Sequence, residues 1–292
     1  MTSALGGGRR IALLHPRYWP EVRRGSERFI HDLGSRLPRR GFEPTLITSH
    51  RERRSRTTEA GMTVVRRRRP PEWPLHRLGI WEHALHLPAS YRSLRAGEFG
   101  LAHALYPTDA LAANRWSRCS GRPSVLSVMG VPNREVIERS AWRASMWRRI
   151  TAGADRVIFL SRYAAEASAW LTSGEVIEPG VDLELFRLGS ERSARPRLFA
   201  PAAGEDPRKR VALLVEAVAV IRHRYPDLEL LLGRVRGGRV PAGYDPATYP
   251  WIRTVDLDEH ESLVHAYGSS WLTVHAAREE AFGLVLAESL AC

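Results

Sequence analysis

Cysteine, lysine and long apolar runs are scarce in this chain of 292 residues. Its two cysteines, Cys119 and Cys292, have no neighbours at metal-ligand spacing, which argues against a disulfide framework or structural zinc and predicts a reducing, cytoplasmic location. No apolar run approaches about 18 residues, so no membrane-spanning helix is expected. The opening "MTSALGGGRR" lacks the apolar core typical of a signal peptide, and we expect residues 1–8 to be disordered.

Arginine supplies almost all of the positive charge, because Lys209 is the only lysine. The net charge of +12 would suit nucleic acid, an anionic membrane surface or a phosphate-bearing substrate. An arginine bias is also typical of GC-rich coding, so we expect no specific nucleic-acid partner. The run Arg66–Arg69 predicts either a solvated strand end or a contact with lipid or acceptor.

Short apolar runs alternate with segments of helical spacing, which is typical of parallel sheets covered by helices. Helices are predicted after the first run and over 82–96, 108–117, 134–152 and 208–226. On the helix over 82–96, His83 and His86 share a face, for which a structural role is favoured over metal binding. Strands are predicted at 10–15, 42–50, 62–68, 101–106, 123–129, 155–161, 197–203, 228–233, 251–255 and 271–277.

A segment rich in Pro, Gly, Ser and Arg interrupts this alternation at residues 176–197. We therefore predict an α/β chain of two Rossmann-like domains, over residues 9–190 and 191–292. Ligands bind such sheets at the carboxyl ends of the strands, so a cleft between the two domains is expected there.

Three segments that follow predicted strands carry residues suited to a phosphorylated sugar. Gly25 opens a helix, where free backbone N–H groups favour an anion, although Ser26 as a simple helix cap explains this segment equally well. Arg208 and Lys209 lie at the start of another helix, where cations oppose the helix dipole unless an anion binds there. A compact ammonium suits a diphosphate.

The third segment is "EEAFGLVLAE", residues 279–288. Glu280 is expected in a loop, projecting into the cleft, where a carboxylate can orient sugar hydroxyls. Gly283 and Leu284 would begin the next helix and offer backbone amides, and Glu288 would lie within it. An ordinary amphipathic helix with two exposed acids explains this segment alone equally well.

Taken together, these segments resemble the retaining nucleotide-sugar glycosyltransferases of family 4, which have the GT-B fold. "EEAFGLVLAE" matches the family's two glutamates separated by seven residues, with an internal Phe-Gly. "PGVDLELF" (179–186) is similar to its interdomain segment, "DPRKR" (206–210) to its phosphate-binding turn, and Arg24-Gly25 to its glycine-rich loop. The resemblance covers residues 10–292.

The resemblance implies a metal-independent enzyme that transfers a sugar from a nucleotide-diphosphate donor with retention of configuration. It gives Glu280 the donor sugar, Glu288 the ribose and Lys209 the diphosphate, assisted by the amides of Phe282, Gly283 and Leu284. It requires no cofactor besides the donor substrate, and the acceptor is a lipid, a glycan or a small metabolite. Association with the inner face of the membrane would suit the basic surface.

Five residues depart from the family pattern, which indicates either variation within the family or weakened activity. Together with the early end of the sequence, two of them, Ala203 and Met129, motivate an alternative, a non-catalytic or inactive nucleotide-sugar binder. Ala203 and Met129 replace a family arginine and histidine, and Arg24 replaces a glycine. His275-Ala276 stands where a Pro-Ser pair is common. A glycoside hydrolase that uses Glu280 and Glu288 as its carboxylate pair is a further alternative, which the phosphate-type loops argue against.

The family continues beyond a segment like 284–292 with further strand–helix units. We therefore expect the second domain to be incomplete, and this chain to be a fragment that is poorly stable and inactive by itself.

Overall fold

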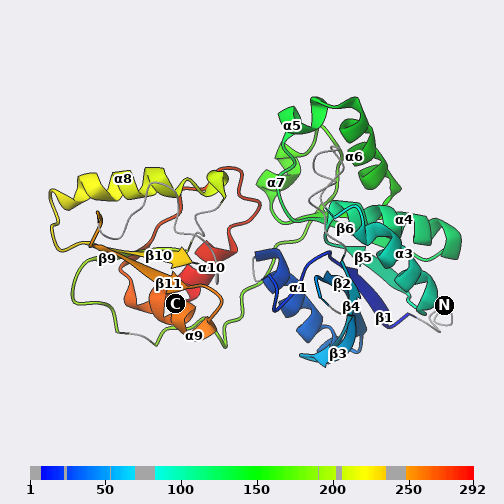
Figure 1. The fold of residues 1–292 in the computed structure, drawn as a ribbon, viewed down its shortest axis with the longest axis horizontal. Coiled ribbons are helices and arrows are strands. Elements are labelled where there is room, and N and C mark those ends of the chain that lie inside the picture. Colours follow the sequence, from blue (N-terminus) through cyan, green and yellow to red (C-terminus); the bar gives the residue numbers. More distant parts are fainter. Residues whose placement is uncertain are drawn as a thin grey trace. The chain divides into compact units, whose positions relative to one another are not determined.

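The computed structural model describes residues 8–22, 25–52, 54–69, 83–189, 191–201, 206–234 and 248–292. The chain divides into two compact units, Met1–Pro179 and Gly180–Cys292, each with its own sheet (Figure 1). This division falls inside the segment 176–197 in which the sequence predicts the break, and before residue 190. Of the expected disordered segment 1–8, all but residue 8 lies outside the described residues.

The first unit contains an eight-stranded sheet in the order β3-β4-β2-β1-β5-β6-β7-β8. All neighbouring strands are parallel except the pair β3 and β4. The central strand is buried on both faces, as expected for a parallel sheet covered by helices. The strands are β1 (Arg10–Leu14), β2 (Glu43–His50), β3 (Ser55–Glu59), β4 (Met62–Arg68), β5 (Leu101–Ala104), β6 (Ser124–Val128), β7 (Arg156–Phe159) and β8 (Glu175–Val176).

The helices of the first unit cover both faces of this sheet, because the strand order reverses between β1 and β5 and right-handed crossovers then lie on opposite sides. Figure 1 shows α1 on one side of the sheet and α3 with α4 on the other. A Cβ at Gly34 of α1 would lie 2.4 Å from the Met62 sulfur, so a larger residue there would require the Met62 side chain to move. The helices are α1 (Gly25–Arg36), the 3₁₀ turn η1 (Pro38–Arg40), α3 (His86–Ala96), α4 (Pro107–Ser120), α5 (Arg134–Glu138), α6 (Ala141–Gly153) and α7 (Arg162–Ala167).

The second unit contains a four-stranded parallel sheet in the order β11-β10-β9-β12. Alternate side chains face two cores: Leu198 and Leu230 pack with α8, whereas Phe199 and Leu231 pack with α9. Its elements are β9 (Arg197–Ala200), η2 (Pro207–Lys209), α8 (Val211–Arg222), β10 (Glu229–Arg234), β11 (Ile252–Asp256), α9 (His260–Ser269), β12 (Leu272–Thr273) and α10 (Leu284–Ala291).

Most of the predicted elements are present, and the predicted α/β class with two Rossmann-like units is confirmed. The helix predicted over 134–152 is two helices, which separate at Arg139 and Ser140, where Ser140 caps α6. The sequence did not predict β3, β8, α7 or α9. Within the described ranges, no helix has the length and apolarity needed to cross a bilayer.

Two arginines of the run Arg66–Arg69 are buried instead of solvated or lipid-facing as the sequence predicts, whereas Arg68 is exposed. Arg66 and Arg69 are each only 7% exposed. Arg66 donates to both carboxylate oxygens of Glu59, at 2.6 and 2.9 Å, and Arg69 pairs with Glu21. Arg66 lies on the face of β4 that also buries Met62 and Val64, whereas Arg69 follows the end of the strand, and each is buried with its own carboxylate partner.

Candidate functional site

The reversal of strand order in the second unit marks a place where parallel sheets bind ligands. Strands β9 and β12 are hydrogen-bonded neighbours, and the helices that follow them pack in different cores, α8 in one and the end of α10, with α9, in the other. Loops at the carboxyl ends of such a pair diverge and leave room for a ligand. The loop after β9 leads to η2 and Lys209, and the loop after β12 contains Glu280.

Lys209 ends a tight turn instead of opening a regular helix. Asp206 begins η2 and accepts a hydrogen bond from the backbone N–H of Arg208 at 2.9 Å. Arg210 then adopts a left-handed conformation, with φ of 51°, before α8 begins at Val211. The turn leaves the Lys209 side chain 30% exposed at the carboxyl end of the sheet.

Arg208 is engaged by its own turn. Its guanidinium donates to both carboxylate oxygens of Asp206, with the shortest distance at 2.7 Å. This hydrogen bonding lowers the pKa of Asp206 and raises the pKa of Arg208. A phosphate that uses Arg208 must therefore compete with Asp206, whereas sequence analysis treated Arg208 as available.

Glu280 and Lys209 are 71 residues apart in the sequence and meet in space. The Lys209 ammonium donates to Glu280 Oε2 at 2.7 Å, and His275 Nε2 lies 3.5 Å from the same oxygen. The two loops are also joined through the backbone, where the Arg278 N–H donates to the Arg208 carbonyl at 2.9 Å. The predicted loop position of Glu280 is confirmed, and the carboxylate and the ammonium that the sequence singles out are in direct contact.

The start of α10 follows Glu280 after three residues, as predicted. Gly283 has a φ of +83°, which favours glycine, and it begins a helix over Leu284–Ala291. The first amides of a helix have no partner within it. Phe282, Gly283 and Leu284 therefore lie where backbone N–H groups can bind an anion or a sugar oxygen.

Glu288 occupies a different environment from Glu280. It is 4% exposed, and its Oε2 accepts a hydrogen bond from the Tyr267 hydroxyl at 2.9 Å. Tyr267 packs edge-on against Phe199 and Phe186 in the core. The two glutamates are thus not a pair of exposed acids, and Glu288 has a structural partner in addition to the ribose contact that the resemblance implies.

Gly25 lies in the first unit, where it starts α1. No atom lies within 4 Å of a Cβ built on it, so the position has open space. Arg24, its predecessor in the expected glycine-rich loop, lies outside the described residues, as does Ala203. The donor-binding role of Gly25 stays a prediction.

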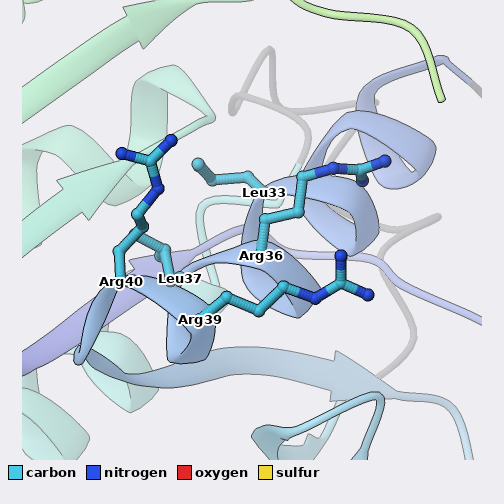
Figure 2. Close-up of a pocket in the computed structure, with 5 residues that line it drawn as sticks. All are labelled: Leu33, Arg36, Leu37, Arg39 and Arg40. Carbon is cyan, nitrogen blue, oxygen red and sulfur yellow. The ribbon is translucent and has the colours of Figure 1, made fainter. Parts of the chain in front are cut away.

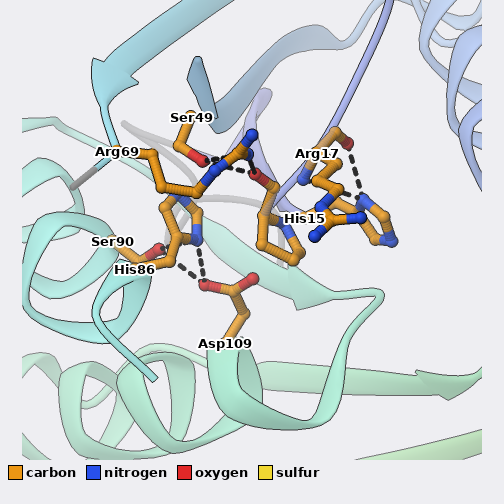
Figure 3. Close-up of polar contacts among 8 residues, drawn as sticks. His15, Arg17, Ser49, Arg69, His86, Ser90 and Asp109 are labelled. Atoms are coloured by element: carbon orange, nitrogen blue, oxygen red, sulfur yellow. Dashed lines mark hydrogen bonds and ion pairs between the residues drawn. The ribbon is translucent and has the colours of Figure 1, made fainter. Parts of the chain in front are cut away.

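Histidines gather near the corresponding strand reversal of the first unit, and Figure 3 shows their polar contacts. His86 Nδ1 lies 2.9 Å from Asp109, which also accepts from Ser90 at 2.6 Å. Burial raises the pKa of Asp109, but His86 and Ser90 outweigh it and lower the pKa. His83 has a φ of 66° and precedes α3, so it does not share a helix face with His86 as predicted.

A separate hollow of about 340 Å³ lies at the end of α1 and on η1 (Figure 2). It is lined by Leu33 and Leu37 together with Arg36, Arg39 and Arg40. The predicted donor-site residues do not line it. Because α1 returns the chain from the carboxyl end of β1 towards the amino end of β2, this hollow lies at the amino edge of the sheet.

The contact of His275 with Glu280 is the feature of this region that the sequence did not predict. The sequence marks the position only as a departure from the family's Pro-Ser pair, and nothing local indicates a contact with Glu280. Over the described part of the chain, no group of three or more His, Cys, Asp or Glu side chains is placed to hold a metal. Metal independence itself stays a prediction.

Comparison with known proteins identifies the family. The model of Glycosyltransferase Family 4 matches residues 23–185, more than half of the chain. The chain belongs to glycosyltransferase family 4. Its sequence is 30% identical over 232 residues to D-inositol 3-phosphate glycosyltransferase 1 of Catenulispora acidiphila, a match that covers 68% of this chain and 56% of that protein. The match thus spans little more than half of that relative.

Solved structures share the fold at low sequence identity. Sucrose-phosphate synthase from Thermosynechococcus elongatus has a TM-score of 0.76 and 19% identity, over 97% of this chain and 79% of that one. HepE of Anabaena in complex with UDP-glucose has a TM-score of 0.69 and 14% identity, over 97% and 78%. These likenesses confirm the predicted GT-B fold.

Proposed function

We propose that this protein transfers a sugar from a nucleotide-diphosphate donor to an acceptor, with retention of configuration and without a metal. The observation that carries the proposal is the 2.7 Å contact between Lys209 and Glu280 at the carboxyl ends of two neighbouring parallel strands. In this contact, Lys209 is a cation that would bind the diphosphate, and Glu280 is a carboxylate that would accept hydrogen bonds from sugar hydroxyls. Family membership supports the reaction class, and the name of the Catenulispora relative and the HepE complex suggest the first substrates to test.

In the proposed reaction the bond between the anomeric carbon and the phosphate oxygen breaks, and its electron pair stays on the departing diphosphate. Lys209 and the amides at the start of α10 stabilise that charge, and Glu280 orients the sugar. The acceptor oxygen bonds to the same face of the anomeric carbon, and its proton passes to a leaving phosphate oxygen. The protein's contribution is then positioning and electrostatic stabilisation.

The test is release of UDP from UDP-glucose in the presence of D-inositol 3-phosphate, with other nucleotide sugars and acceptors as parallel arms. Glu280→Ala and Lys209→Ala should each lower kcat by about 10²- to 10³-fold, as expected when a group that stabilises transition-state charge is removed. Glu216→Ala is the matched control, because Glu216 is exposed on α8. Donor binding without turnover in any arm would favour the inactive-binder alternative. Equal turnover in all variants would contradict the proposal.

We propose further that the arginine-rimmed hollow binds an anionic membrane surface. All three arginines are exposed, the half-buried Leu33 and Leu37 give the hollow an apolar floor, and Phe42 beside it is 37% exposed. Guanidinium groups around an apolar floor complement phosphate headgroups above acyl chains, and each contributes about 1 kcal/mol near an anionic surface. Docking at the amino edge would leave the carboxyl-end loops of the same sheet uncovered. The cytoplasmic location remains a prediction from cysteine usage.

Co-sedimentation with phosphatidylcholine vesicles, with and without phosphatidylglycerol, tests this surface. Changing both Arg39 and Arg40 to Glu should weaken binding by about 30-fold or more, since two contacts of about 1 kcal/mol are lost. The control changes Arg56 and Arg118 to Glu, which are also exposed and give the same change in net charge. An equal loss in both variants would show that only net charge matters and would overturn the assignment.

A further inference from the structure

Two basic side chains meet a single oxygen of Glu280. Lys209 lies 2.7 Å and His275 3.5 Å from Oε2, and they approach from different loops, after β9 and after β12. His275 is only 9% exposed, whereas Lys209 is 30% exposed. The more accessible partner of Glu280 is therefore the residue that the proposed function assigns to the diphosphate.

The proposed function gives Lys209 two anionic partners. An ammonium has three donors and can bridge Glu280 and a phosphate, but its single charge is then shared with a diphosphate. The electrostatic stabilisation of the Glu280 carboxylate by Lys209 is consequently weaker in the donor complex, in which Glu280 must hold the sugar. His275 is the other basic group within 4 Å of the Glu280 carboxylate in the described ranges.

We propose that His275 is a positioning residue for Glu280, which takes up a proton when the donor diphosphate engages Lys209. The inference rests on the proposed function and deepens it. In the empty site, Lys209 is the main partner of Glu280. In the donor complex, protonated His275 replaces the charge that Lys209 gives to the phosphates and keeps the Glu280 carboxylate in place.

The electrostatics of the site give the sign of this linkage. Burial lowers the pKa of His275, Glu280 raises it, and Lys209 lowers it. A bound diphosphate offsets the charge of Lys209 and so removes one of the two influences that lower the pKa. The other charges of these loops form pairs of their own, Arg208 with Asp206 and Arg278 with Glu279. Donor binding should therefore raise the pKa of His275 and draw a proton from solution.

The experiment is calorimetry of UDP binding to the full chain near pH 7, in buffers that differ in ionisation enthalpy. The dependence of the heat on the buffer gives the number of protons taken up. We expect an uptake of roughly 0.2–0.8 proton per UDP in the unmodified chain, beyond that of UDP itself. His275→Asn should abolish this extra uptake. His265→Asn should preserve it, because His265 is exposed on α9.

Equal proton uptake in His275→Asn and the unmodified chain would overturn the inference while leaving the proposed donor site intact. Absence of UDP binding in the unmodified chain would contradict the proposed function and this inference with it. Should His275→Asn fold poorly, the imidazole proton signals of the unmodified chain decide by NMR, with His275→Gln for assignment. The pKa of His275 must rise when UDP binds, and an unchanged pKa would refute the proposal.

Discussion

The hydrogen bond between Tyr267 and Glu288 offers a direct test of how the second glutamate is held. Tyr267→Phe removes a hydroxyl that lies 2.9 Å from a buried carboxylate and leaves the aromatic ring in place. A buried acceptor that loses a donor costs about 1–3 kcal/mol, and more when it is charged. For a domain of this size, each kcal/mol lost from the unfolding free energy lowers the Tm by about 4 °C.

The free energy is best measured by hydrogen exchange of the β9 and β10 amides, because these report the second unit alone. A double-mutant cycle with Glu288→Gln should give a coupling of about 1–2 kcal/mol, since glutamine still accepts the hydrogen bond but carries no charge. Tyr225→Phe is the control, because Tyr225 is 47% exposed. A change below about 0.5 kcal/mol in Tyr267→Phe, equal to that of the control, would refute a core role for Glu288.

Three further expectations concern the turn, a buried histidine and a paired arginine. Gly283→Ala should lower the unfolding free energy of the second unit by about 1–2 kcal/mol in denaturant titrations, because the φ of Gly283 is +83°. The control Gly180→Ala, at an exposed position without positive φ, should change the unfolding free energy little. Similar losses in both variants would contradict the left-handed turn. Burial lowers the pKa of His103 from 6.5 to about 4, so the unfolded chain binds the proton first and the unfolding free energy should fall as pH drops from about 6.5 to about 4. His103→Asn should flatten the pH dependence of stability in that window, and an unchanged slope would count against a buried neutral histidine. Arg66→Met should leave Glu59 without its bidentate partner and so raise the carboxyl pKa of Glu59, which Arg66 now lowers; NMR titration showing no rise would be inconsistent with the pair.

Local patterns in the sequence were sufficient for most of the fold. The helix after Gly283 was predicted to start at this glycine and to include Glu288, and the structure has it over Leu284–Ala291, because a glycine, an apolar run and a preceding strand all mark its start. The strand β3, "SRTTE", escaped prediction because it has no apolar alternation and is held by pairing with β4. The family resemblance supplied the chemistry of Lys209 and Glu280, and the structure supplied their contact.

Contacts between residues that are far apart in the sequence account for the features that could not be predicted from it. The partner of Arg66 is on the neighbouring strand, and Tyr267 reaches Glu288 from α9, across 21 residues. Neither contact leaves a periodic pattern, since each depends on which side chains meet after folding. The contact of His275 with Glu280 is similar, because it depends on a loop conformation that includes Glu279 at a φ of 55°.

Binding of UDP to matched variants tests the central claim that Lys209 and Glu280 form the two halves of a donor site. By calorimetry, Lys209→Ala should weaken UDP binding by about 10- to 150-fold, the loss expected for a hydrogen bond to a charged group. Glu280→Ala should instead strengthen UDP binding by about 1.5- to 5-fold, because it frees the partly exposed Lys209 from its 2.7 Å ion pair, and it should remove any added affinity of UDP-glucose over UDP. Opposite signs for the two variants, with Glu216→Ala unchanged, are the result that this account predicts. Unchanged UDP affinity in Lys209→Ala, or an equal loss in both variants, would contradict it.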